Sequence, residues 1–141
     1  MADKVRAGKV AEDVLERIRL KKRRQYMKLL EVSDLTKELA QAAERRDEVA
    51  VKMLLNMREA LLLELSESEE GIWEEVNSQP EEEAILLGTV LNATTAKAQG
   101  NLPELEAQVL KNRQLLEKIC EVDKQVSLKI GGKRSFYNSF R

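Results

Sequence analysis

The sequence predicts an all-α protein, an antiparallel bundle of three or four long helices with coiled-coil-like packing. Its 141 residues include only six glycines and two prolines, and the helix-favouring residues Ala, Glu, Lys, Leu and Arg dominate. Apolar residues recur at steps of three, four or seven, as in amphipathic helices. No segment shows the alternating pattern of a strand. We therefore expect one helical-bundle domain over residues 1–130 and a flexible, basic, aromatic tail over residues 131–141.

A first long helix is predicted over residues 4–46. Its positions at heptad spacing are Leu15, Ile18, Lys22, Gln25, Leu29, Val32, Thr36, Leu39 and Ala43. Lys22 and Gln25 are polar at positions where a bundle places apolar side chains. Two explanations are open: this part of the helix extends beyond the bundle, or the long side chains carry their polar ends to water. A break near Ser33 and Asp34 is the alternative to one continuous helix.

A second helix is predicted over residues 48–76. Asp47 follows two arginines and precedes a glutamate, so it is expected to cap this helix. The side expected to face the bundle carries Val49, Met53, Leu54, Met57, Ala60, Leu61, Leu65 and Ile72. Met53 and Met57 are interpreted as core residues, although methionine also suits adaptable binding surfaces. Trp73, the only tryptophan, is expected to anchor the end of the helix against the bundle.

The clearest break in the chain lies at residues 77–80, where a turn sequence ends in proline. A third helix is predicted over residues 81–98, with Ser78 as its cap and three glutamates in its first turn, where the helix dipole favours negative charge. Its inward residues are expected to be Ala84, Leu87, Val90, Leu91 and Thr94. Gly88 weakens this helix, and Gly100 is expected to end it.

The last helix is predicted over residues 102–130, with Asn101 as its cap and Pro103 in its first turn. One apolar face consists of Leu102, Leu105, Val109, Leu116, Ile119, Val126 and Ile130. A second apolar set consists of Leu110, Leu115, Cys120 and Val122. Because successive side chains turn by about 100°, these residues cannot all lie on one narrow seam. We expect some of them to pack in the bundle while others remain available to a partner.

Charge is unevenly distributed, although the net charge is only −1. Residues 1–58 hold fifteen Lys and Arg against ten Asp and Glu, residues 59–96 hold ten Glu and no Lys or Arg, and residues 97–141 hold nine basic against five acidic residues. The favoured interpretation is that the acidic segment lies beside basic helices, and the alternative is an acidic face for a basic partner. The basic run at residues 17–24 is interpreted as a solvated face or as pairing with the acidic segment, ahead of a contact with a protein or an anionic surface. Specific binding of nucleic acid is not expected, because the chain as a whole is not basic.

The sequence lacks the residues on which most enzymes and metal sites depend. It contains no histidine, which excludes Ser-His-Asp and Cys-His catalysis and most zinc sites, and it has no glycine-rich phosphate-binding motif. We therefore expect no catalytic residue, cofactor or metal. Cys120 is the only cysteine and is expected to be a buried, unreactive thiol, which suits a reducing compartment. With no signal-peptide pattern and no apolar run long enough to cross a bilayer, the sequence favours a cytoplasmic protein without membrane insertion.

Three segments resemble the bacterial flagellar export chaperones. Residues 42–72 resemble the helix–turn–helix of that family, whose R-E-x-L-L core corresponds to Arg-Glu-Ala-Leu-Leu at 58–62. Asn-Arg-Gln-Leu-Leu-Glu at 112–117 resembles the N-R-x-L-L segment of the FlgN-type closing helix. Residues 132–138 are similar to the basic, tyrosine-bearing tails of FlgN-type and FliT-type members. The basic run at 17–24 departs from the family pattern.

The resemblance implies a cytoplasmic chaperone that keeps a flagellar export substrate soluble and delivers it to the export apparatus. FlgN-type members serve the hook–filament junction proteins and FliT-type members serve the filament cap, and the sequence does not decide between them. The expected partners are thus a hook-associated or cap protein and components of the export apparatus, with the chain itself a monomer or dimer. The alternative function is a coiled-coil scaffold or regulatory adaptor with no role in export.

The resemblance also implies that the client binds the C-terminal helical region. The wide apolar face of the last helix, able to pair with an amphipathic helix, points to the same region. The expected client-binding residues are Leu115, Leu116, Ile119, Val122, Val126, Ile130, Phe136 and Tyr137. Among Val122, Val126, Ile130 and Phe136, at least two are expected to be accessible and to contribute little to stability.

Overall fold

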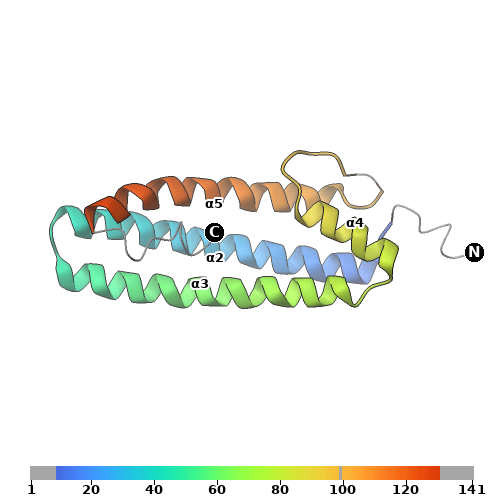
Figure 1. The fold of residues 1–141 in the computed structure, drawn as a ribbon, viewed down its shortest axis with the longest axis horizontal. Helices are drawn as coiled ribbons and strands as arrows, with labels where there is room; N and C mark the ends of the chain where they lie inside the picture. Colours follow the sequence, from blue (N-terminus) through green and yellow to red (C-terminus); the bar gives the residue numbers. More distant parts are fainter. Residues whose placement is uncertain (1–8, 99, 131–141) are drawn as a thin grey trace, which may run out of the picture. The chain divides into compact units, whose positions relative to one another are not determined.

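The computed structural model describes residues 9–98 and 100–130, and all regular secondary structure in these residues is helical (Figure 1). The helices are α2 (Glu12–Glu44), α3 (Glu48–Asn77), α4 (Glu81–Leu91) and α5 (Pro103–Lys129). The predicted all-α fold is confirmed, whereas the predicted tail at 131–141 lies outside the described residues. None of the helices in the described part of the chain is long and apolar enough to span a membrane.

Two of the predicted helices have the correct bounds and two are shorter than predicted. α3 and α5 agree with the predictions to within one residue, and α2 is continuous, without a break near Ser33 and Asp34. However, α2 spans Glu12–Glu44 and not 4–46: residues 9–11 are not helical, and residues 4–8 lie outside the described residues. α4 ends at Leu91, where its C-cap Asn92 donates its backbone N–H to carbonyls of the last turn. The following residues include two threonines, which have low helix propensity, so the prediction of a helix to residue 98 with an inward Thr94 is wrong.

The described residues group into two compact units, to which α2, α3 and α5 each contribute a part. Unit 1 contains the chain up to Tyr26 and the segment Ser66–Arg113. Unit 2 contains the segment Met27–Leu65 and the described residues from Gln114 to Ile130. The sequence predicted one domain over residues 1–130, and that stays a prediction, while the described residues pack as two compact units.

Unit 1 has one apolar core, to which α2, α3, α4 and α5 all contribute. Its buried residues are Val10, Val14, Leu15, Ile18, Ile72, Val76, Leu87, Val90, Leu91, Leu102, Leu105 and Val109. α2 and α3 run antiparallel here, since residues 17 and 22 of α2 contact residues 75 and 69 of α3. Trp73 packs on this core, as predicted, and its indole N–H donates to a carboxylate oxygen of Glu69 at 3.0 Å. The short α4 thus covers the end of α3.

The predicted cap residues of α4 and α5 have other roles in unit 1. Ser78 donates its hydroxyl to the carbonyl of Glu75 in the preceding helix, while the N-cap position of α4 is Pro80, which has no side-chain cap. The prediction that Ser78 caps α4 is therefore wrong. The Asn101 carboxamide binds both backbone groups of Val10, accepting from N–H at 3.1 Å and donating to C=O at 2.8 Å. It thereby fastens the start of α5 to the segment before α2.

Unit 2 has two apolar clusters between α2, α3 and α5. The first is formed by Leu29, Val32, Leu65 and Ile119, and the second by Leu39, Ala42, Leu54, Leu55 and Val126. Along α5 the chain thus passes from the end of this α3 segment toward its start, which makes α3 and α5 antiparallel. The expected antiparallel packing is confirmed within each unit.

The turn between α2 and α3 is closed by backbone hydrogen bonds. Arg46 adopts a left-handed conformation with φ 58°, and the N–H of Asp47 donates to the carbonyl of Ala42 at 3.0 Å, a common way to satisfy the last carbonyls of a helix. The Asp47 carboxylate accepts from the N–H of Ala50 at 3.1 Å. The predicted cap of α3 is confirmed.

Candidate interaction surfaces

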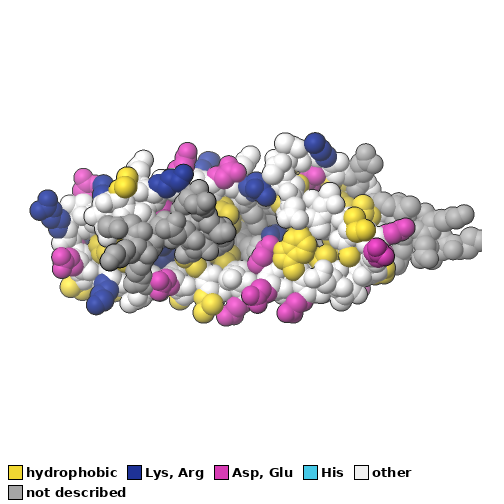
Figure 2. Space-filling view, in the orientation of Figure 1, with side chains coloured by type: hydrophobic (Ala, Val, Ile, Leu, Met, Phe, Trp, Pro, Cys, Tyr) yellow, Lys and Arg dark blue, Asp and Glu magenta, His cyan; other side chains and the backbone are white. Residues whose placement is uncertain are grey.

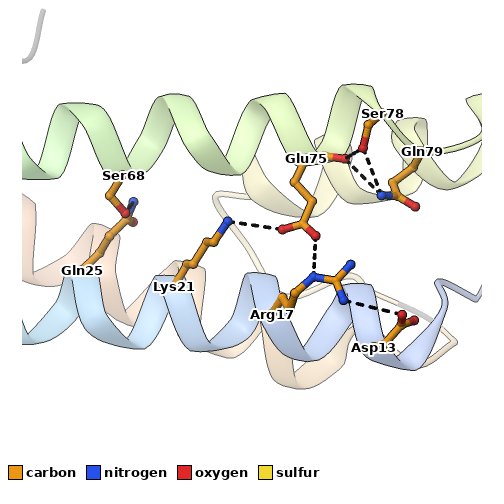
Figure 3. Close-up of polar contacts among 8 residues, drawn as sticks. All are labelled: Asp13, Arg17, Lys21, Gln25, Ser68, Glu75, Ser78 and Gln79. Atoms are coloured by element: carbon orange, nitrogen blue, oxygen red, sulfur yellow. Dashed lines mark hydrogen bonds and ion pairs between the residues drawn. The ribbon is translucent and has the colours of Figure 1, made fainter.

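A ladder of charged contacts joins α2 to α3 in unit 1 (Figure 3). Arg17 Nε lies 2.7 Å from one carboxylate oxygen of Glu75, and Lys21 Nζ lies 3.3 Å from the other. Burial favours the neutral form of Glu75, but the hydrogen bonds from Arg17 and Lys21 outweigh it, so the pKa of Glu75 is lowered. The hydrogen bond to Glu75 in turn raises the pKa of Arg17.

These contacts bear on the interpretation of the basic run at residues 17–24 as pairing with the acidic segment. Arg17, Lys21 and Lys22 bind glutamates of the acidic segment, which confirms the pairing predicted from the charge distribution. Arg23 and Arg24 remain at the surface of α2. The structure therefore uses three of the six basic residues of this run for packing α2 against α3. Arg19 pairs with Glu16 and Glu104 instead.

The interior of unit 1 contains a polar layer. Lys22 and Gln25 are buried, and Lys22 Nζ lies 2.9 Å from a carboxylate oxygen of Glu69. The Gln25 amide donates to the same oxygen at 3.0 Å and to the hydroxyl of Ser68 at 3.2 Å, and Figure 3 shows Gln25 facing Ser68 across the two helices. The Asn112 amide of α5 donates to the carbonyl of Lys22 at 2.9 Å. Lys22 and Gln25 therefore do not lie on a part of α2 that extends beyond the bundle, and they do not carry their polar ends to water. Both side chains bind polar partners inside the unit.

Glu69 is the acceptor that gathers this layer together. Burial alone would raise its pKa, but the positive charge of Lys22 and hydrogen bonds from Lys22, Gln25 and Trp73 lower the pKa of this carboxyl below its ordinary value. The carboxylate is therefore ionised at neutral pH and holds α2 and α3 in one register.

Unit 2 contains a charged pair in a much drier setting. Arg58 of α3 and Asp123 of α5 are 2% and 0% exposed, with 2.6 Å between Nη1 and Oδ1. Arg58 also donates to the hydroxyl of Thr36 on α2 at 3.3 Å, so this guanidinium touches all three helices of the unit. Sequence reasoning missed this pair. The available signal was the spacing, since Asp123 lies four residues after Ile119 and three before Val126, on the buried seam.

The predicted client-binding residues of α5 lie mainly against the cores of unit 2. Ile119 and Val126 are buried members of the two clusters. Leu115, Leu116, Val122 and Ile130 are half-buried and pack against these clusters. Phe136 and Tyr137 lie outside the described residues. The structure thus assigns Val126 to the core, and the client-binding role of the whole set stays a prediction.

Most of the exposed large apolar residues of unit 2 lie on α3, while Met27 and Leu30 of α2 and Leu128 of α5 are exposed as well. Val49, Met53, Met57 and Leu63 are 81%, 56%, 48% and 60% exposed, and Ala60 between them is exposed as well. Steps of four, four, three and three place these five residues on one side of the helix, here called the α3 face. Figure 2 shows apolar side chains between charged ones along the edge that α3 forms.

Sequence analysis assigned part of the α3 face to the interior, and that assignment is wrong. Val49, Met53, Met57 and Ala60 were grouped with Leu54, Leu61 and Leu65, but only the second group packs inward. α3 is apolar on two sides, and periodicity alone does not show which side meets the rest of the protein. Met53 and Met57 therefore fit the other interpretation of methionine, an adaptable exposed surface.

The remaining chemistry of the described residues is limited. Cys120 is half-buried, and burial together with the charge of Asp123 raises the pKa of its thiol, which keeps it in the unreactive protonated form. No group of three potential metal ligands occurs in the residues that the structure describes.

Comparisons of the chain with protein-family models, with curated proteins and with solved structures give no match. Functional inference therefore rests on the residues and surfaces described above.

Proposed function

We propose that this chain is a cytoplasmic, non-enzymatic chaperone of the flagellar export type. It binds a hook-associated or filament-cap protein, keeps that client soluble and unassembled, and hands it to the export apparatus. The observation that carries the proposal is the α3 face, an exposed helical row of apolar residues on an all-helical protein. The sequence supports the proposal as well. Residues 42–72, which include this face, resemble the helix–turn–helix of those chaperones.

The α3 face suits an amphipathic helix of a client. From Val49 to Leu63 it extends for fourteen residue steps, roughly 21 Å at about 1.5 Å per residue. A client helix with apolar residues three and four apart can lie along this row and cover it. The thioethers of Met53 and Met57 adapt to side chains of different shape, which suits a surface that holds a client without a rigid fit.

The α5 residues are the second surface to consider. Ile119 and Val126 can reach a client only if α5 leaves the cores of unit 2, and the loss of such residues from a core costs about 2–5 kcal/mol each. The α3 face requires no such opening. It is therefore the first place to seek client binding.

The test uses fluorescence anisotropy with labelled terminal segments of hook-associated and filament-cap proteins. The double substitution Met53→Glu with Met57→Glu is expected to weaken binding by more than tenfold without a change in melting temperature, because both side chains are exposed. Ile85→Glu is the matched control, since Ile85 is 60% exposed and belongs to α4 in unit 1, not to the α3 face. If the wild-type chain binds none of these segments, the flagellar assignment is wrong.

A scaffold or adaptor remains the second candidate function, because the same exposed face permits self-assembly. The two functions predict assemblies of different size. A chaperone stays small and gains one client, whereas a scaffold grows with concentration into open-ended assemblies. Light scattering coupled to size-exclusion chromatography, with and without the client segment, separates them.

A further inference from the structure

We propose that Met53 and Met57 form an oxidation site on the α3 face, where a peroxide makes the face polar and a sulfoxide reductase reverses the change. The site itself follows from the exposure and the position of the two side chains. Its role, to make client binding sensitive to oxidants, rests on the proposed function.

The methionines in the described part of the chain all lie at the surface. Met27 of α2 is 60% exposed, and Met53 and Met57 of α3 are 56% and 48% exposed. Methionine is among the residues that proteins most often bury, so this exposure sets the three side chains apart. Access of the oxidant to the sulfur governs how readily a residue of this kind is oxidised. The three thioethers are therefore expected to react almost as fast as in an unfolded chain.

The one thiol of the chain is a poorer target for a peroxide. Cys120 is half-buried, and burial together with the charge of Asp123 raises the pKa of its thiol. Peroxides react with the thiolate, which is the minor form of this group at neutral pH. Among the sulfur atoms of the described residues, the thioethers are thus the first to be oxidised.

The two methionines of α3 occupy the middle of the α3 face. They lie four residues apart, about 6 Å along the helix axis, and on the same side of the helix. Val49 precedes them in the row and Leu63 ends it. Met27 belongs to α2 and not to this row. Oxidation of Met53 and Met57 therefore places two polar groups at the centre of the face, where binding energy is usually concentrated.

The reaction is balanced with hydrogen peroxide as the only other reactant. A lone pair of the thioether sulfur attacks one peroxide oxygen, the O–O bond breaks, and an S–O bond forms. Sulfur loses two electrons, and the second oxygen leaves as water with both peroxide hydrogens. The product is methionine sulfoxide, which is polar and which reductases convert back to the thioether. In that step two thiols become a disulfide and the oxygen leaves as water.

The position of the site at the surface separates the effect on binding from the effect on folding. A sulfoxide oxygen on an exposed helix is hydrated, so the fold is retained. Under a client helix the same oxygen loses its water without gaining a hydrogen-bond donor, which is unfavourable. Oxidation is therefore expected to weaken client binding and to leave the melting temperature unchanged.

The first experiment needs no client. The full chain is treated with hydrogen peroxide, and peptide mapping by mass spectrometry follows each methionine. Met53 and Met57 are each expected to gain one oxygen at a rate within about threefold of that in the urea-unfolded chain. Hydrophobic interaction chromatography should then show weaker retention, and treatment with a sulfoxide reductase should restore it. Circular dichroism verifies that the oxidised chain is folded.

The matched control for this experiment is the double substitution Met53→Leu with Met57→Leu. Leucine has nearly the same volume as methionine and is not oxidised by peroxide. The variant retains Met1 and Met27, so any change in its retention comes from elsewhere in the chain. Its retention is expected to change much less than that of the wild type.

The second experiment measures the anisotropy of a labelled client segment. Oxidation is expected to weaken binding to the wild type by about fivefold or more. The Met53→Leu, Met57→Leu variant should bind equally well before and after treatment. A Met27→Leu variant should stay as sensitive as the wild type, because Met27 lies outside the α3 face.

The oxidation site is overturned if the folded chain protects Met53 and Met57 by more than about tenfold. Equal changes in retention for the wild type and the double leucine variant overturn it as well. The proposed function fails separately. If the site is oxidised as expected but the untreated chain binds no segment, the site stands and the chaperone role does not. If untreated and oxidised chains bind a segment equally, the chaperone role stands and its sensitivity to oxidants is wrong.

Discussion

The two units bury charged residues in different surroundings. In unit 1, Lys22 binds Glu69, whose side chain is 43% exposed, and hydrogen-bonding groups of three other residues lie nearby. In unit 2, Arg58 and Asp123 bind each other with almost no access to water. Both arrangements satisfy their polar groups, since no buried side-chain nitrogen or oxygen in the described residues lacks a hydrogen-bond partner.

The comparison indicates how much stability is lost when one member of a charged pair is removed. The loss depends on whether water or another polar group can take the place of that member. In unit 1, water reaches Glu69 and several donors share it, so the layer can rearrange. In unit 2, removal of one member of the pair leaves the other charge almost without access to water. The same kind of contact is thus expected to make a moderate contribution in one unit and a large one in the other.

The largest effect is expected from Asp123→Ala in unit 2. It leaves the Arg58 guanidinium buried without its carboxylate, which should lower the free energy of unfolding by about 3–5 kcal/mol. Urea unfolding followed by circular dichroism measures this loss. The control is the double substitution Arg58→Met with Asp123→Leu, which removes both charges and should recover most of the stability. A loss below about 1 kcal/mol for Asp123→Ala would show that water reaches this pair.

A smaller effect is expected from Glu69→Ala in unit 1. Lys22, Gln25 and Trp73 lose their shared acceptor, which should lower the free energy of unfolding by about 1–3 kcal/mol. Because the Trp73 indole donates to Glu69, its fluorescence should change in the folded state as well. Glu70→Ala is the matched control, an exposed neighbour whose substitution should stay within about 0.5 kcal/mol. Equal losses for Glu69→Ala and Asp123→Ala would break the contrast between the units.

The next effect is a loss of stability in acid, which we expect in unit 1 because two of its glutamates become protonated. The pKa values of Glu69 and Glu75 are lowered in the folded state from the ordinary value of 4.5. Their contribution to stability is therefore complete above pH 4.5 and is lost as the pH falls from there through the folded-state pKa values. Urea midpoints measured across this window should decline less in Glu75→Gln than in the wild type. An unchanged pH profile in that variant would contradict the assignment.

The smallest effect is expected from Gly88→Ala, and its sign is opposite. An alanine Cβ at this position lies 3.6 Å from the Trp73 ring, an ordinary van der Waals distance. Alanine is favoured over glycine inside a helix by about 0.5–1 kcal/mol, so α4 and unit 1 should become more stable by that amount. Gly71→Ala supplies the control, because a Cβ there meets no atom within 4 Å. A rise in melting temperature for Gly71→Ala alone would show that the contact with Trp73 is too tight.

Local chemistry was sufficient to predict the elements of this protein. Helix-favouring composition, apolar spacing and the cap at Asp47 depend on neighbours in sequence, and they predicted helical structure and the bounds of α3 and α5 closely. The sequence also predicted the pairing of the basic run with the acidic segment, because oppositely charged side chains on neighbouring helices attract each other.

Only the tertiary structure decided which surfaces are buried. α3 has two apolar sides, and the inward one is chosen by contacts with α2 and α5, residues far apart in the chain. The same reason hid the pairing of Arg58 with Asp123, two charged residues whose burial makes sense only when both are in place. Sequence patterns report the period of a helix, whereas packing decides which of its sides meets the core.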